Sequence, residues 1–310
     1  MRRIATATIV LTSLTGCQQS ELAQSWQIDR TRVLAVKAEV LDEDGNTTTV
    51  AEAQPGETIG LSALIVHPDL PTSALWLGCS SEEASPFGCT PSEELFELLG
   101  GLDPMGMTPE EMAEFQAQAQ ALGLVGLEPF MPPSYTFPDD FLDHLTDSER
   151  LEGDELQLTI MATPISDSGA PDESDTELAT KRVPVSTSTT PNHNPDILQL
   201  LVNGEAMTSG QEITVIGGEK YEIEPILSEE PEDYIYVTSD GESDLRTEDP
   251  FFEFYTTEGS YDTPYSLFGD FQGVVWTAPD VSTADTVTIW VVSRDRRGGM
   301  GWIQQTFTVE

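Results

Sequence analysis

Cysteine thiols are the side chains whose spacing points most directly to chemistry in this sequence. Of the three cysteines in the 310-residue chain, Cys79 and Cys89 lie close together. No second pair of Cys or His residues accompanies them to complete the tetrahedral shell that zinc requires. In an exported protein two thiols this close usually form a disulfide. We therefore predict a Cys79–Cys89 disulfide that closes a small loop.

The third cysteine, Cys17, ends a segment with the features of an export signal. Arg2 and Arg3 make a positively charged start, and the stretch Ile4–Leu14 is apolar. This stretch is too short to span a bilayer, which needs about 20 apolar residues, but it fits the core of a signal peptide. The tetrapeptide that ends it, Leu14-Thr15-Gly16-Cys17, resembles the lipobox of bacterial lipoproteins.

The lipobox resemblance implies a lipid-anchored protein. It implies a signal peptide over residues 1–16, acylation of Cys17 and a lipidated tether over residues 17–27. Gln18 after the cysteine resembles the sorting signal for the outer membrane. We expect an outer-membrane protein, at the periplasmic face or the cell surface, whose membrane contact is the lipid at Cys17. An ordinary secretory signal with a chance cysteine is the alternative.

Acidic residues dominate the composition. The chain has 55 Asp and Glu against 13 Lys and Arg, a formal net charge of −42. Because phosphate binding needs clustered Lys and Arg, this composition argues against nucleic acid as a partner. A saline habitat and extracellular calcium binding both fit such acidity, and composition does not separate them.

The sequence contains no motif that indicates catalysis. Nucleophile-elbow, zinc-protease, phosphate-loop and dinucleotide patterns are missing. Its histidines, His67, His144 and His193, are scattered. Carboxylates are so numerous that no pair is selected, although this leaves a carboxylate-based glycan hydrolase open. We predict a non-enzymatic protein without a cofactor.

Strand patterns indicate the fold. Residues 28–188 contain segments with alternating apolar side chains, such as residues 59–65. Residues 189–195 lack apolar side chains and are predicted as a linker. Strand patterns then restart and continue through residues 196–310.

The two halves share one plan. Gly218–Leu227 matches Gly56–Ile65 in apolar character, and Asp233–Val237 stands where Ala74–Cys79 stood in the first half. A repeated order of strands with turn signals between them predicts two tandem antiparallel β-sandwiches, which the resemblance described next identifies as Ig-like. The fold class is therefore mainly β, with a small α-helical insertion in the first sandwich.

The second half carries a family resemblance. Trp276-Thr277-Ala278-Pro279, followed by a strand and the Asp295–Gly299 turn, resembles the end of bacterial Ig-like and cadherin-like surface repeats. The whole chain also resembles tandem-domain lipoproteins of unassigned role. The calcium-binding string of true cadherins is missing, so the resemblance does not extend to calcium.

The insertion, at about residues 90–150, contains three helix starts. Thr90 and Thr108 are each followed by Pro and then by Glu at the third position, as in capped helices, and Pro138–Leu145 suggests a third helix. The helices either cover an open edge or end of the sheet or dock a partner. The docking alternative uses Met105, Met107, Met112, Phe130 and Met131.

Two features suggest ligands. Eight aromatics crowd residues 251–271. They either fill a sandwich core or form an exposed shelf that stacks on sugar rings. The candidate residues of such a shelf are Phe251, Phe254, Tyr255, Tyr261 and Tyr265.

Acidic loops at residues 42–46 and 167–175 have the oxygens that Ca²⁺ prefers, yet they also fit solvated turns.

The combined interpretation is a lipid-anchored envelope protein with a non-enzymatic role in adhesion, surface display or scaffolding. The alternative is a ligand-binding lipoprotein for a glycan or Ca²⁺ that uses segment 251–271 or the acidic loops. An unknown envelope protein or glycan is the expected partner.

Overall fold

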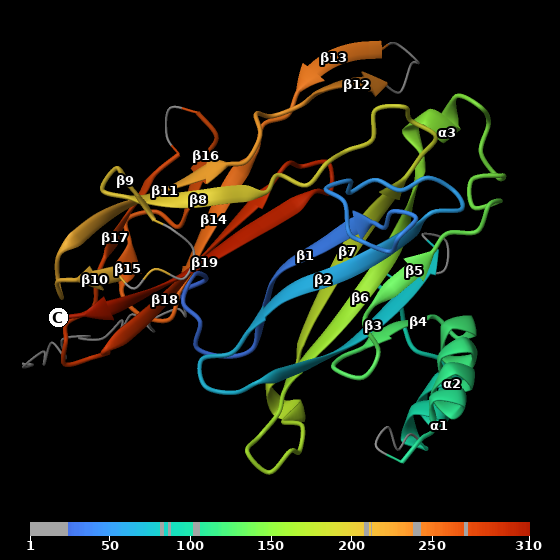
Figure 1. The fold of residues 1–310 in the computed structure, drawn as a ribbon, viewed down its shortest axis with the longest axis horizontal. Helices are drawn as coiled ribbons and strands as arrows, with labels where there is room; N and C mark the ends of the chain where they lie inside the picture. The colour runs from blue at the N-terminus through green and yellow to red at the C-terminus, as the bar shows by residue number, and fades with distance from the viewer. Residues whose placement is uncertain are drawn as a thin grey trace, which may run out of the picture.

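The chain folds into two β-sandwiches that lie against each other (Figure 1). The computed structural model describes residues 24–80, 84–85, 88–101, 106–207, 211, 213–237, 243–269 and 272–310. The predictions for the signal peptide, for Cys17 and for most of the tether lie outside the described residues, as do those for Met105 and Phe271. The prediction of a mainly β chain with tandem Ig-like sandwiches is confirmed.

The first sandwich packs a three-stranded sheet on a four-stranded sheet. The smaller sheet has the order β1 (Arg32–Val40), β2 (Thr58–Val66), β5 (Ser134–Thr136). The larger sheet has the order β4 (Leu124–Leu127), β3 (Thr72–Ser80), β6 (Asp154–Pro164), β7 (Glu177–Val185). A one-turn 3₁₀ helix, η1 (Glu173–Asp175), lies between β6 and β7.

The second sandwich packs two five-stranded sheets. One has the order β15 (Ser260–Tyr261), β17 (Val274–Thr277), β11 (Lys220–Leu227), β8 (Ile197–Val202), β9 (Glu205–Met207). The other has the order β10 (Ile213–Val215), β19 (Met300–Val309), β18 (Thr286–Arg294), β14 (Phe251–Thr256), β16 (Tyr265–Leu267).

The two sandwiches repeat one topology. The pairings β1–β2–β5 and β4–β3–β6–β7 recur as β8–β11–β17 and β16–β14–β18–β19. Their cores are built alike, because alternate side chains of each strand point inward. Trp76, Leu158 and Ile160 are buried in the first core, and Trp276 and Phe307 in the second.

The position that we predicted for one strand was wrong. Asp233–Val237, which we predicted as the counterpart of the Trp76 strand, is β12 and lies outside the sandwich. Among the described residues it pairs only with β13 (Ser243–Thr247), and the two form a hairpin that projects from the second sandwich (Figure 1). The true counterpart of β3 is β14, which pairs with β18 as β3 pairs with β6.

The helical insertion lies between β3 and β4. Helix α2 (Pro109–Ala121) begins with the predicted capping box of Thr108 and Glu111. Helix α1 (Glu93–Gly100) is capped by Ser92 rather than by the predicted Thr90. Residues 138–145 form turns instead of a helix, and the short α3 (Glu149–Glu152) follows them. In the described part of the chain, no helix is long and apolar enough to cross a membrane.

The insertion covers apolar surface of the β4–β3–β6–β7 sheet. Leu95 of α1 and Phe115 of α2 are buried against Leu77 and Leu124. The alternative of Met side chains as docking contacts is not favoured by this packing, because Met131 is 5% exposed and Met107 and Met112 are partly buried against the same cluster. Phe96 and Phe130 stay exposed.

A third apolar cluster joins the two sandwiches. Leu34, Leu64 and Val66 from the outer face of the β1–β2 sheet pack on Trp290 and Val292 from the outer face of β18. Strand β18 is thus buried on both faces, which explains its continuous apolar run Ile289–Val292. We call this contact the junction.

A charge placed in the junction is expected to separate the sandwiches without unfolding them. Leu64→Arg puts a cation where Leu64 is 9% exposed, yet leaves both sandwich cores intact. We expect a loss of about 3 kcal/mol in unfolding free energy and a larger radius of gyration in X-ray scattering. Leu178→Arg, at a site that is 63% exposed, is the control. An unchanged scattering profile for Leu64→Arg would contradict the junction.

Candidate interaction surface

Four of the chain's few cations reach across the junction. Each meets an oxygen from the opposite sandwich or from the segment that joins the two. The contacts are Lys37 Nζ to Asp196 Oδ1 at 2.8 Å, Arg294 Nη2 to Leu34 O at 2.8 Å, Arg297 Nη2 to Glu52 Oε2 at 3.8 Å, and Lys181 Nζ to Gly298 O. Charges therefore reinforce the apolar contact.

Asp295 organises the turn between β18 and β19. It is 2% exposed and accepts hydrogen bonds from the backbone of Arg297 at 2.7 Å and of Gly299 at 2.9 Å, and from Asn192 Nδ2 at 2.7 Å. Burial raises the pKa of Asp295 above its ordinary value, while the Asn192 hydrogen bond opposes this rise. Gly298 has φ of +110°, which fits the predicted glycine turn.

The segment predicted as a linker is part of the junction. Asn192 is 1% exposed and its backbone donates to Glu52 Oε2 at 2.9 Å. Asn194 donates from Nδ2 to Ala38 O at 2.8 Å and accepts from Met300 N at 2.9 Å. These bonds tie residues 192–194 to both sandwiches.

Lys181 is the most buried cation of the junction. It is 4% exposed, and burial lowers its pKa to about 8 even though the nearby Asp295 carboxylate favours the charged form. The Lys181 ammonium donates to Gly298 O, so a strand of the first sandwich holds the turn of the second.

Arg297 links the junction to the β12–β13 hairpin. Its Nη1 lies 2.9 Å from Glu248 Oε1, directly after β13, and its guanidinium lies 4.3 Å from the ring centre of Tyr234 in β12. Burial raises the pKa of Glu248, and the Arg297 contact opposes this rise. One arginine thus contacts the first sandwich through Glu52 and the base of the hairpin through Glu248 and Tyr234.

The hairpin has one face turned to arginines and one turned to solvent. On the first face, Tyr234 lies under Arg297, and Tyr236 lies 3.7 Å from the Arg246 guanidinium. On the other face, Ile235 and Leu245 are direct cross-strand partners and are 65% and 69% exposed. An isolated two-stranded hairpin is marginally stable by itself, so an exposed apolar pair on it is a candidate contact surface.

The base of the hairpin borders an acidic depression. A shallow open hollow is lined by His193, Asp196, Glu229, Glu230, Glu232 and Glu248, among other residues. His193 Nδ1 lies 2.7 Å from Glu232 Oε1. Within the described ranges, no group of three His, Cys, Asp or Glu side chains is placed to hold a metal ion.

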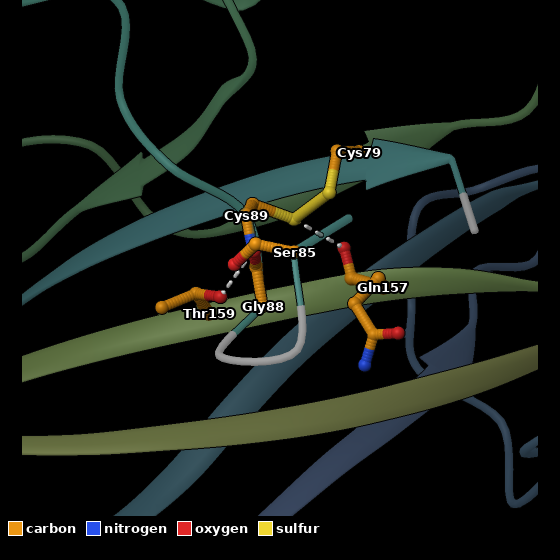
Figure 2. The surroundings of a disulfide bond; sticks show 6 residues. All are labelled: Cys79, Ser85, Gly88, Cys89, Gln157 and Thr159. Atoms are coloured by element: carbon orange, nitrogen blue, oxygen red, sulfur yellow. Dashed lines mark hydrogen bonds between the residues drawn. A yellow bond between two sulfur atoms is a disulfide. The ribbon is translucent and has the colours of Figure 1, made fainter. Parts of the chain in front are cut away.

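The predicted disulfide is present and fixes the start of the helical insertion. Cys79 at the end of β3 bonds to Cys89, whose backbone donates to Thr159 Oγ1 at 2.8 Å (Figure 2). Gly88 has φ of +96°, and a Cβ there would lie 2.2 Å from Thr159 Oγ1, so only glycine fits beside β6. The bond joins neighbouring backbone segments ahead of α1.

The aromatic segment does not form one exposed shelf. Phe254 and Tyr261 are 0% and 6% exposed and belong to the second core, so neither is available to a ligand. Phe251 and Tyr255 are partly buried, and Tyr265 is 63% exposed. Successive side chains of β14 point to opposite faces, so Phe252 and Phe254 point into the core. For this reason the alternative of an exposed aromatic shelf was wrong.

Acidic loops and histidines are engaged in local contacts. Asp42 accepts hydrogen bonds from the side chain of Asn46 at 3.1 Å and from the backbones of Asn46 at 2.8 Å and Asp44 at 2.9 Å, and these bonds lower the pKa of Asp42. Asp172 likewise accepts from Ser174. His67, His144 and His193 each face a separate carboxylate, so the structure does not bring them together. Calcium binding by the acidic loops stays an untested alternative.

Sequence reasoning missed both the junction and the exposed hairpin. The continuous apolar run in β18 was the available signal for the junction, because a strand buried on one face alternates. For the hairpin, the signal was Asp240-Gly241 followed by the polar Ser243–Thr247, a pattern typical of a tight turn and a solvated strand.

Comparisons with known proteins give a loose likeness of fold. No protein-family model and no curated protein matches the chain. A bacterial ice-binding adhesin is 11% identical, with 90% of this chain and 66% of that chain covered and a TM-score of 0.21. The D00–D0 domain of intimin is 7% identical (88% and 100% covered, TM-score 0.21). The C-terminal domain of the Streptococcus pyogenes antigen I/II-family protein AspA is 12% identical (89% and 100% covered, TM-score 0.21). The architecture described above rests on the chain's own strand pairing.

Removing the disulfide is expected to loosen the helical insertion. For the Cys79→Ser/Cys89→Ser variant we expect a loss of about 3 kcal/mol in unfolding free energy, measured by urea unfolding. Reductant should lower the stability of the native protein to the same level and leave the variant unchanged. Equal stability of the oxidised protein and the variant would contradict this role.

Removing the Asp295 carboxylate is expected to destabilise the junction strongly. Asp295→Ala leaves three donors, two of them buried, without their acceptor, so we expect a loss of about 3–5 kcal/mol. Asp249→Ala is the matched control, because the Asp249–Arg296 pair at 3.4 Å is exposed and contributes at most about 1 kcal/mol. Similar losses for both variants in urea unfolding would refute the role of Asp295.

Proposed function

We propose that the chain is a lipid-anchored envelope protein with a non-enzymatic role in adhesion, surface display or scaffolding. The observation that carries the proposal is a joined pair of sandwiches from which a hairpin projects, with Ile235 and Leu245 exposed to solvent. Four cations and an apolar cluster hold the sandwiches together. A body of this kind holds a contact surface at a fixed position and needs no catalytic cluster.

Two further features support the envelope location. The segment from Arg2 to Cys17 resembles a lipoprotein signal with its lipobox. The Cys79–Cys89 disulfide fits an oxidising compartment outside the cytoplasm. We place the protein at the outer membrane, on its periplasmic face or on the cell surface.

The position of residues 26–28 indicates which end of the second sandwich the proposed lipid anchor would hold near the membrane. Thr256 at the end of β14 donates from its backbone to Trp26 O at 3.0 Å and accepts from Ile28 N at 2.9 Å. Gln24 is seven residues further along the chain than Cys17, and seven extended residue steps span at most about 25 Å. A lipid on Cys17 would hold the Thr256 end of β14 near the membrane, while the hairpin lies beyond the opposite end, at Phe251.

The alternative of a glycan-binding lipoprotein loses part of its support. Phe254 and Tyr261, two of its five proposed contacts, lie in the core. The exposed Tyr265 by itself gives a single stacking surface, so we favour the protein-contact role.

Metabolic labelling with palmitate tests the anchor. We expect the full chain to incorporate label and to sediment with membranes, and Cys17→Ala to lose both properties because its thiol cannot be acylated. The Cys79→Ser/Cys89→Ser variant is the matched control and should keep the label. Labelled Cys17→Ala protein would contradict the proposal.

A further inference from the structure

We propose that the β12–β13 hairpin docks a cationic, extended polypeptide segment, which pairs with the outer edge of β13 and packs on Ile235 and Leu245. This inference rests on the proposed scaffolding role and names its contact surface and the chemistry of its partner. The recognition mode is strand addition, in which backbone hydrogen bonds give affinity and alternate side chains give specificity.

The backbone of β13 provides an open edge. Glu248 N donates to Glu232 O at 2.8 Å, and hydrogen-bonded pairs alternate along an antiparallel ladder. By this alternation the N–H and C=O groups of Ser243, Leu245 and Thr247 point away from β12. All five residues of β13 are exposed, and no other described strand pairs with them. Such an edge is a template for another strand.

The apolar pair lies on a face of the hairpin that an added strand could cover with its own side chains. Ile235 and Leu245 lie directly opposite each other on the face that the arginines do not cover. An added strand beside β13 would place its own alternate side chains on this face, next to Leu245. Two valine or isoleucine side chains from the partner would shield surface that is now 65% and 69% exposed.

Charge selects the partner. Residues 228–250 contain nine Asp and Glu residues and one arginine. Arg246 already contacts Asp244 at 3.2 Å. A second copy would bring two acidic edges together, and anionic lipids or nucleic acids would meet the same repulsion. A segment rich in lysine or arginine is attracted instead, which raises its association rate and its affinity at low salt.

The hairpin is mounted rigidly enough to serve as a template. Its base is held by the contacts of Arg297 with Glu248 and Tyr234, and the hydrogen bond of Thr247 Oγ1 to Asp233 Oδ1 at 2.6 Å joins its two strands. Because these contacts already orient the edge of β13, binding of a partner does not carry the entropic cost of ordering that edge.

The test measures binding of defined peptides to the purified full chain. The probe is a ten-residue peptide of alternating lysine and valine, and the comparison peptide alternates glutamate and valine. We expect binding of the lysine peptide that weakens as salt rises, and at least tenfold weaker binding of the glutamate peptide. Binding should also slow amide exchange at Ser243, Leu245 and Thr247.

Matched variants separate docking from general attraction to an acidic protein. Ile235→Ser/Leu245→Ser keeps every charge, and we expect it to bind the lysine peptide at least tenfold more weakly. Leu198→Ser, at another leucine with 63% exposure, should bind as the native chain does. Circular dichroism and thermal unfolding check that both variants are folded.

Three outcomes would overturn the inference. The first is equal binding by the native chain and the double-serine variant, and the second is an equal loss for Leu198→Ser. The third is self-association of the native chain that the double-serine variant abolishes, which would make a second copy the occupant. The peptide assay does not depend on Cys17, so failure of the palmitate test would leave it intact, and the reverse also holds.

Discussion

Burial of both faces of β18 is the constraint on which the rest of the structure depends. Val287, Ile289 and Val291 point into the second core, while Trp290 and Val292 pack on the outer face of β1–β2. Successive side chains of a strand point to opposite faces, so one strand belongs to two apolar clusters. The relative position of the sandwiches follows from this strand.

Polar contacts add to the apolar contact that holds the two sandwiches together. A chain with a net charge of −42 repels itself, and this protein places four of its 13 cations where the sandwiches meet. The buried Asp295 carboxylate accepts hydrogen bonds from its own turn and from Asn192 in the segment that joins the sandwiches. Through Arg297 the same site holds the base of the β12–β13 hairpin, so the position of the hairpin depends on the junction.

Much of the fold follows from local sequence, because alternation, turn residues and caps act over a few residues. The capping box at Thr108 and Glu111, the glycine turn after Asp295 and the Cys79–Cys89 bond are of this kind. The first strand of the hairpin does not follow from local sequence, because Tyr234–Val237 is a run of four apolar or aromatic residues like that of a buried strand. Only pairing with β13, far from any sheet, separates it from β14. The exposure of β12 is a tertiary property that the pattern of β12 itself does not encode.

The most direct test of the account is a distance distribution between the two sandwiches. Spin labels at Leu178→Cys in β7 and Leu198→Cys in β8, both at exposed sites, report on the two halves in pulsed electron paramagnetic resonance. We predict a single narrow distance distribution that broadens when Leu64→Arg is added. A broad distribution in the absence of Leu64→Arg would mean that the sandwiches move independently, and would contradict the account of a rigid junction that positions the hairpin.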